Sequence, residues 1–371
     1  MSTSIGQYGA SAANLVLSAA VQELTNAQTT LAWQTSSKGI TAETFAGLGS
    51  SRTNVFELTP KITQVNAWQS NITSAQNSLT VTASALKQIV SLAQSMATNL
   101  LSIGGSSSTS AVNTVATEAS SSLGQLATVL NTSNGTGYVF AGQSSTEAPV
   151  ANPSSVTSGT TSTQIADTLN SLTSGASMVS VLQQATVLMN GDSSIFSSTI
   201  SSPTSAADSL ALANSQQTST ITGDSTASHY GIVATQGNPA DANTTSTSSP
   251  ISTGSPIKDL MRDMMLVSGM QGMSSTSPGY SDMITQLHTS LVNTTNQLIS
   301  METAVGAQQN ALSARSTLLT NTATALQTQL DNARTTDIGM VAIQSANVQT
   351  SLKASFMLIA NMKDMSLANY L

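Results

Sequence analysis

The most constraining feature of this sequence is a seven-residue repeat of apolar side chains near each end. In the C-terminal part, the repeat is formed by Ile284, Leu291, Leu298, Val305, Leu312, Leu319, Leu326 and Ala333. A strict seven-residue spacing keeps one apolar stripe against a partner helix and favours a left-handed coiled coil. The repeat therefore predicts a helix roughly 75 Å long.

A second heptad stripe lies near the other end of the chain. It is formed by Leu58, Val65, Ile72, Leu79, Leu86, Ala93 and Leu100, with Trp68, Ala75, Thr82, Ile89, Met96 and Ile103 at the offset positions. We expect Pro60 in the first turn of this helix, where proline is tolerated, and Gly104-Gly105 at its end. The predicted fold is mainly α: a long antiparallel helical coiled-coil bundle made of both termini, with the intervening sequence as an insertion.

The offset positions of the C-terminal stripe are less regular. Leu287 and Met301 are apolar, whereas Thr294, Gln308 and Arg315 are polar. Such a seam is weak as an isolated pair, so we expect the other helices of a larger bundle to cover the polar positions. Periodicity alone is equally compatible with the core of an ordinary helical bundle.

The extreme ends show the pattern of two further amphipathic helices. In the first, at 15–31, the heptad positions are Leu17, Leu24 and Leu31. In the second, at 338–359, one face is formed by Val341, Val348, Leu352, Phe356 and Ile359. The predicted domains are an N-terminal assembly helix and loop (1–50), two shaft segments (51–150 and 257–336), an outer domain (151–256) and a C-terminal assembly helix (337–371).

The middle of the chain is rich in Ser, Thr, Gly and Asn. It can be a disordered linker or a small domain. Apolar clusters at 179–182 and 185–189, together with helical spacing at 205–215, favour a small mixed α/β or β-rich outer domain. The glycine-bounded segment 137–142 predicts a short strand, within a hairpin near 137–149. A methionine-rich helix is expected at 256–273, with its methionines as core residues.

Charge and composition exclude several classes of function. Only 7% of residues are charged and the net charge is −7. No Lys or Arg occurs between Lys87 and Lys258, which argues against nucleic-acid binding. The chain has no cysteine and no apolar run of about 18 residues, and its start has no basic segment followed by an apolar one. We therefore expect neither membrane insertion nor a cleaved signal peptide.

No catalytic motif is present. The two histidines, His229 and His288, have no metal-binding spacing around them, and phosphate-binding glycine loops and nucleophile elbows are absent. We expect no catalytic, cofactor-binding or metal site, and no enzymatic activity.

Several segments together resemble a known family. The segment 137–149, GYVFAGQSSTEAP, resembles the flagellar hook-associated proteins of the hook–filament junction (the hook-associated protein 3 family). The segment 305–312, VGAQQNAL, is similar to a stretch shared by flagellins and junction proteins, and the end SLANYL is similar to both of their C-termini. The segment 44–49, TFAGLG, replaces an Asp-Asp pair that the family usually carries and is similar to a form seen in some alphaproteobacterial members. The chain thus resembles the flagellin superfamily over residues 1–150 and 257–371.

The resemblance implies a structural subunit of the bacterial flagellum. Members of the family are exported unfolded through the flagellar secretion apparatus, lie outside the cell and assemble with like subunits through their terminal helices. The implied partners are a neighbouring hook-associated protein, flagellin and an export chaperone. The alternatives are a flagellin, a secreted helical-stalk adhesin or effector, and an enzyme in the middle block.

The expected assembly residues fall into two sets. The seam set is Leu58, Val65, Ile72, Leu79, Leu86, Leu100, Ile284, Leu291, Leu298, Val305, Leu312, Leu319 and Leu326. The terminal set is Leu17, Leu24, Leu31, Ile338, Val348, Leu352, Ile359, Leu367 and Leu371.

Overall fold

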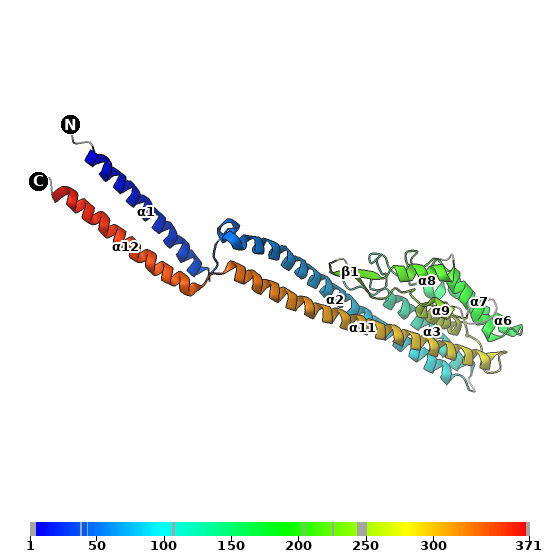
Figure 1. Ribbon diagram of the computed structural model, residues 1–371. Coiled ribbons are helices and arrows are strands. Elements are labelled where there is room, and N and C mark those ends of the chain that lie inside the picture. The colour runs from blue at the N-terminus through cyan, green and yellow to red at the C-terminus, as the bar shows by residue number, and fades with distance from the viewer. Residues whose placement is uncertain are drawn as a thin grey trace. The chain divides into compact units, whose positions relative to one another are not determined.

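The computed structural model is mainly helical, as the heptad repeats predict (Figure 1). It describes residues 5–37, 39–42, 44–105, 108–202, 205–224, 226–242 and 251–368; the side chains of 5–14, 45, 206, 226 and 362–368 are not described. The chain forms two compact units. Unit 1 comprises residues 1–67 and 319–371, and unit 2 comprises residues 68–318.

Two long helices run through both units. They are α2 (Arg52–Ser102) and α11 (Tyr280–Arg334), and they are antiparallel. In unit 2, the Tyr280 hydroxyl at the start of α11 donates a hydrogen bond to the carbonyl of Ile103, just after α2 (2.7 Å). In unit 1, Leu330 near the end of α11 packs against Val55 near the start of α2. These contacts confirm the predicted antiparallel return.

Unit 1 also contains the terminal helices. They are α1 (Ile5–Ser36) and α12 (Ile338–Ala368), which pack against each other. A short 3-10 helix, η1 (Phe45–Ser51), leads into α2, and its Leu48 joins the cluster of Val55 and Leu330. Backbone hydrogen bonds from Thr41 to Arg334 and from Thr336 to Gly39, each 2.7 Å long, tie the two connecting loops together.

The core of unit 2 is built around α3 and α10. Helix α3 (Thr109–Leu130) begins at Ser108, whose side chain accepts from the N–H of Ala111. Helix α10 (Pro256–Ser268) packs on it and is buried at every position from Pro256 to Val267. Met261, Met264 and Met265 are fully buried there, as expected for core methionines.

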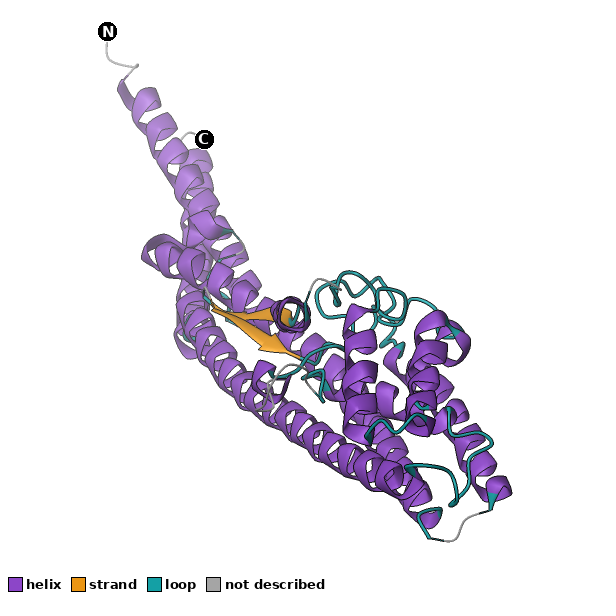
Figure 2. Ribbon diagram, turned by 90° about the vertical axis from the view of Figure 1, so that its right-hand side faces the viewer, coloured by secondary structure: helices purple, strands orange, loops and turns teal. Residues whose placement is uncertain are grey.

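The inserted region combines short helices with one sheet (Figure 2). Its helices are α4 (Ser155–Ser158), α5 (Thr160–Thr168), α6 (Asn170–Thr173), α7 (Met178–Gly191), α8 (Ala206–Ser215) and α9 (Pro239–Ala242). Strands β1 (Thr218–Gly223) and β2 (Thr226–Tyr230) form an antiparallel hairpin with a bulge between Ile221 and Gly223. The described part of the insertion is therefore a mixed helical and β structure.

Two local expectations differ from the structure. Pro60 lies in the interior of α2 rather than in its first turn, because the helix begins eight residues earlier, at Arg52. The segment 137–149 forms turns and a single bridge between Ser133 and Tyr138 instead of a strand. Its backbone groups bond to several different segments, so no neighbouring strand runs along it.

Candidate assembly surface

Most of the expected seam residues are buried. In unit 2 these are Ile72, Leu79, Leu86, Leu100, Ile284, Leu291, Leu298, Val305 and Leu312. In unit 1, Val65 and Leu319 are buried, whereas Leu58 and Leu326 are half-buried. The heptad stripe therefore forms the buried side of α2 and α11 along both units.

The terminal helices bury only part of their apolar surface. Leu31 and Leu352 are buried at the α1–α12 contact, as is Val341. Leu17, Leu24 and Val348 are half-buried. Of the remaining expected residues, Ile338 and Ile359 are exposed, the side chain of Leu367 in α12 is not described, and Leu371 lies outside the described residues.

A large set of apolar side chains in unit 1 is left exposed to solvent. On α12 these are Ile338, Met340, Ile343, Phe356, Met357, Leu358 and Ile359, with exposed fractions from 39% to 67%. Leu15 and Val16 on α1 and Phe56 on α2 are more than two-thirds exposed. Phe356 and Ile359, which the helical period places on the same face of α12 as Val341, are nevertheless exposed. Sequence analysis also missed Met357, Leu358 and Phe56, which lie off the heptad stripes.

The run of four apolar residues from Phe356 to Ile359 constrains any partner. Successive residues of an α-helix are about 100° apart, so four in a row cover the whole circumference. All four are exposed in α12. Contiguous apolar surface of this kind marks an interaction site. A partner or set of partners that buries it must approach α12 from more than one side.

Two polar seam residues of α11, Gln308 and Arg315, form hydrogen bonds with another part of the same chain. The backbone N–H of Gly231, just after β2, donates to Oε1 of Gln308 (2.9 Å). Nε of Arg315 donates to the carbonyl of Thr222 in β1 (3.0 Å). On α2, the side chain of Asn71 donates to the carbonyl of Ile221 (3.0 Å). The β1–β2 hairpin, rather than another helix of the chain, therefore contacts Gln308 and Arg315.

The family-like segment 137–149 anchors this hairpin. The backbone N–H of Gln143 donates to the carbonyl of Gln216 (2.8 Å), and its side-chain amide donates to the carbonyls of Ser215 and Gln217. These three carbonyls lie at the junction between α8 and β1. Gly142 allows this approach, because a Cβ there would lie 2.1 Å from the Gln216 oxygen. The segment thus positions the start of β1.

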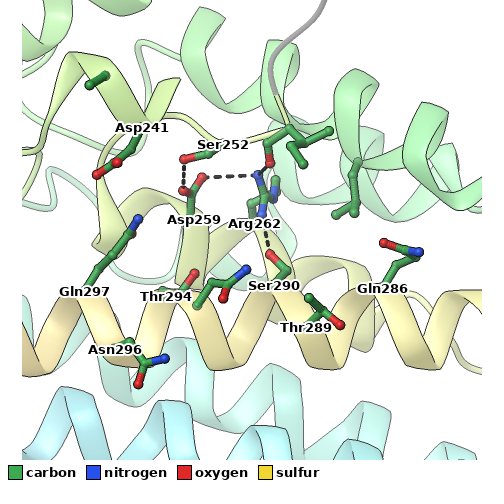
Figure 3. Close-up of a pocket in the computed structure, with 14 residues that line it drawn as sticks. Asp241, Ser252, Asp259, Arg262, Gln286, Thr289, Ser290, Thr294, Asn296 and Gln297 are labelled. Carbon is green, nitrogen blue, oxygen red and sulfur yellow. Dashed lines mark hydrogen bonds and ion pairs between the residues drawn. The ribbon is translucent and has the colours of Figure 1, made fainter. Parts of the chain in front are cut away.

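A buried ionic cluster is formed by Asp259, Arg262 and Asp263 of α10 with Ser290 of α11. Figure 3 shows Asp259, Arg262 and Ser290. Arg262 is 1% exposed and pairs with Asp259 at 3.1 Å and with Asp263 at 2.7 Å. Its guanidinium also donates to Thr186, Ser290 and the carbonyl of Ile251. Although burial acts to lower it, the pKa of Arg262 is raised, because the neighbouring carboxylates favour its charged form.

A pocket of about 370 Å³ lies beside this cluster, lined by Asp241, Gln286 and Gln297 among others (Figure 3). All three guanidinium nitrogens of Arg262 donate to protein groups, so the cluster has no free cationic edge for a ligand. It joins α10 to α7 and α11 through Thr186 and Ser290 and is structural.

The described residues contain no group of three or more His, Cys, Asp or Glu side chains that could hold a metal ion. His229 is exposed on β2 and His288 is half-buried on α11. Among the described residues, no helix is both long enough and apolar enough to cross a bilayer.

Comparison with known proteins gives a structural likeness but no sequence relative. No family model matches the sequence, and no curated protein matches it. A solved structure from Vibrio parahaemolyticus, of a protein assigned as a flagellar hook-associated protein, aligns with a TM-score of 0.50 at 12% identity. The alignment covers 76% of this chain and 97% of that chain. At this identity, the likeness establishes a shared fold.

Proposed function

We propose that this chain is a structural, non-enzymatic subunit of the bacterial flagellum, and that it is a junction (adaptor) protein between hook and filament. The observation that carries the proposal is the exposed apolar surface of α12 and α1. A helix that exposes four consecutive large apolar residues is suited to being enclosed by other protein. The fold shared with a protein assigned as hook-associated supports the flagellar setting.

The proposed partners follow from this surface. Copies of the chain enclose one another's terminal helices in a ring or tube, and the two ends of that assembly meet a hook-associated protein and flagellin. Before assembly, an export chaperone covers the same apolar residues. The subunit leaves the cell through the flagellar secretion apparatus and functions on the extracellular flagellum.

A flagellin is the second candidate, because the segment 305–312 is similar to both kinds of protein. The segment 137–149 favours the junction protein. Copy number separates the two: in sheared flagella a flagellin is the main band, whereas a junction protein is a minor one. A labelled copy should lie as a single focus at the base of each filament.

Deletion of residues 337–371 tests the wider proposal. A flagellar subunit without α12 should leave cells non-motile and release filament protein into the medium. Normal motility would instead indicate a secreted stalk protein, such as an adhesin or effector. Hydrolase activity in the full chain would indicate an enzyme.

A further inference from the structure

A second pocket lies between the β1–β2 hairpin and α11. It has a volume of about 330 Å³, and Thr222, Ser228, Tyr230, Gln308, Leu312 and Arg315 contribute to its lining. These residues come from two elements far apart in sequence that the hairpin contacts bring together. None of them belongs to the exposed apolar surface of unit 1, so the assembly role leaves this pocket unexplained.

Arg315 is the charged group of the pocket. Only Nε of its guanidinium is used, in the 3.0 Å hydrogen bond to the carbonyl of Thr222. The four N–H groups of its two terminal nitrogens have no hydrogen bond or ion pair with the residues that the structure describes. A half-buried guanidinium with two unused terminal nitrogens therefore lines the pocket, and no carboxylate lies in the described lining.

The neutral groups around Arg315 can also donate hydrogen bonds. Oε1 of Gln308 accepts a hydrogen bond from Gly231. The two amide N–H groups of the same side chain are therefore not used by Gly231. The hydroxyls of Thr222 and Ser228 lie 3.1 Å apart and share one hydrogen, which leaves the second hydroxyl hydrogen free. Burial raises the pKa of Tyr230, which keeps its phenol protonated and able to donate. The hydroxyls of Ser228 and Tyr230 can therefore donate to a ligand that also contacts Arg315.

We propose that this pocket binds a small oxyanion, with the free edge of Arg315 as its charged anchor and the hydroxyls of Ser228 and Tyr230 as neutral donors. A guanidinium edge matches two oxygens of a phosphate, sulfate or carboxylate group. Leu312 supplies an apolar part of the lining. The bound anion bridges the hairpin and α11 and so stabilises the docked hairpin.

The test compares the thermal unfolding of the full-length protein in sodium phosphate, sodium acetate and sodium chloride at equal ionic strength. Phosphate also stabilises folded proteins by exclusion from their surface, so variants are needed to isolate binding. The wild type should show a larger increase in Tm in phosphate or acetate than Arg315→Gln does, and the affinity of that variant should be at least about tenfold weaker. Arg52→Gln, on the exposed start of α2, is the matched control and should behave as the wild type.

A second variant tests whether misfolding, rather than loss of the anion site, explains a lost response. Gln308→Glu keeps an acceptor for the Gly231 N–H and adds a carboxylate to the pocket that Arg315 also lines. It should fold and should no longer respond to phosphate or acetate beyond the chloride control. A stronger response to phosphate identifies a free tetrahedral anion as the ligand, and a stronger response to acetate identifies a carboxylate. Equal responses of the wild type, Arg315→Gln and Gln308→Glu would overturn the proposal.

Discussion

Lys258 brings a positive charge into the core of unit 2. Its Nζ donates to the hydroxyls of Ser201 (3.0 Å) and Ser209 (3.2 Å) and lies 5.8 Å from the centre of the Phe196 ring. Burial lowers the pKa of Lys258 to about 8, against the opposing influence of Asp192 and Asp259. Below that pH the charge is held in the folded protein at a cost in stability.

The lowered pKa predicts a pH dependence of stability. Between pH 8 and pH 10.5, the unfolded chain keeps a proton on Lys258 that the folded chain has lost, so the free energy of unfolding rises with pH. The full contribution across this window is of order 3 kcal/mol. Lys258→Met should remove this rise, as measured by urea denaturation at several pH values. Lys87→Met, at an exposed position, should retain it; identical slopes in all three proteins would contradict the prediction.

Arg262 offers a second prediction at the level of single residues. Arg262→Met leaves Asp259 and Asp263 buried without their cation, and breaking a buried ion pair in this way costs about 3–5 kcal/mol. The loss should appear as a lower urea midpoint for unfolding. Arg52→Met changes an exposed arginine and should alter the midpoint little. A small effect of Arg262→Met would show that the cluster is not a major source of stability.

Among the elements, α12 carries two kinds of residue: buried ones that stabilise the subunit, and exposed ones that we expect to contact other subunits. Phe356 and Leu358 are exposed, so the double substitution Phe356→Ser and Leu358→Ser should leave the helix content of the monomer unchanged. It should strongly reduce self-association measured by sedimentation velocity. Gln349→Ser, on the exposed surface of the same helix, should leave self-association intact.

Leu352→Ser supplies the opposite comparison. It removes a buried side chain from the α1–α12 contact, so it should destabilise unit 1 in a circular dichroism melt by roughly 2–5 kcal/mol. Undiminished association of the Phe356/Leu358 variant would argue against α12 as the assembly surface.

The segment 137–149 gives a prediction for the hairpin. Gly142 has φ of 63°, and a Cβ there would collide with the carbonyl of Gln216. Gly142→Ala should therefore destabilise unit 2 by about 1–3 kcal/mol and increase amide hydrogen exchange in β1 and β2. Gly135 also has a positive φ, but a Cβ there would meet no other atom. Gly135→Ala therefore measures the effect of backbone strain without a collision. Equal effects of the two substitutions would show that the approach to Gln216 is unimportant.

Helix prediction succeeded where the apolar period was long. Leu291 and Leu298 belong to a heptad stripe that lies on one face only if the chain forms a long helix, and both are fully buried. The hairpin escaped prediction because β1 reads Thr-Ser-Thr-Ile-Thr-Gly, with no alternation of apolar and polar residues. Its stability depends on Gln308, 77 residues away from Gly231, and no local pattern reveals such a pairing.

The candidate sites were less accessible to sequence analysis. The buried charges of α10 depend on Thr186 and Ser290, which lie far from Arg262 in sequence, so the helix looked like an ordinary methionine-rich segment. The exposed residues Met357 and Leu358 could have been noticed from the run of four apolar residues at 356–359, which exceeds what one buried face requires.

For the whole molecule, the proposed assembly predicts that self-association requires α12. Full-length chains should associate in a concentration-dependent way, and chains lacking residues 337–371 should remain monomeric in sedimentation velocity at the same concentrations. Because unit 2 lies at residues 68–318, the truncated chain should still show the unfolding transition of unit 2 in urea. Association of the truncated chain would place the main assembly contacts outside α12.

The hairpin contacts with α2 and α11 also bear on how the two helices are aligned along their length. Leucine repeated every seven residues permits a slide of one heptad, about 10 Å, that still places apolar side chains opposite apolar side chains. Such a slide would carry Gln308 and Arg315 away from Gly231 and Thr222, and the hairpin contact with Asn71 would no longer match α11. Polar groups at isolated seam positions are known to select one axial alignment at some cost in stability. The hairpin contacts therefore select one axial alignment of α2 and α11 within unit 2.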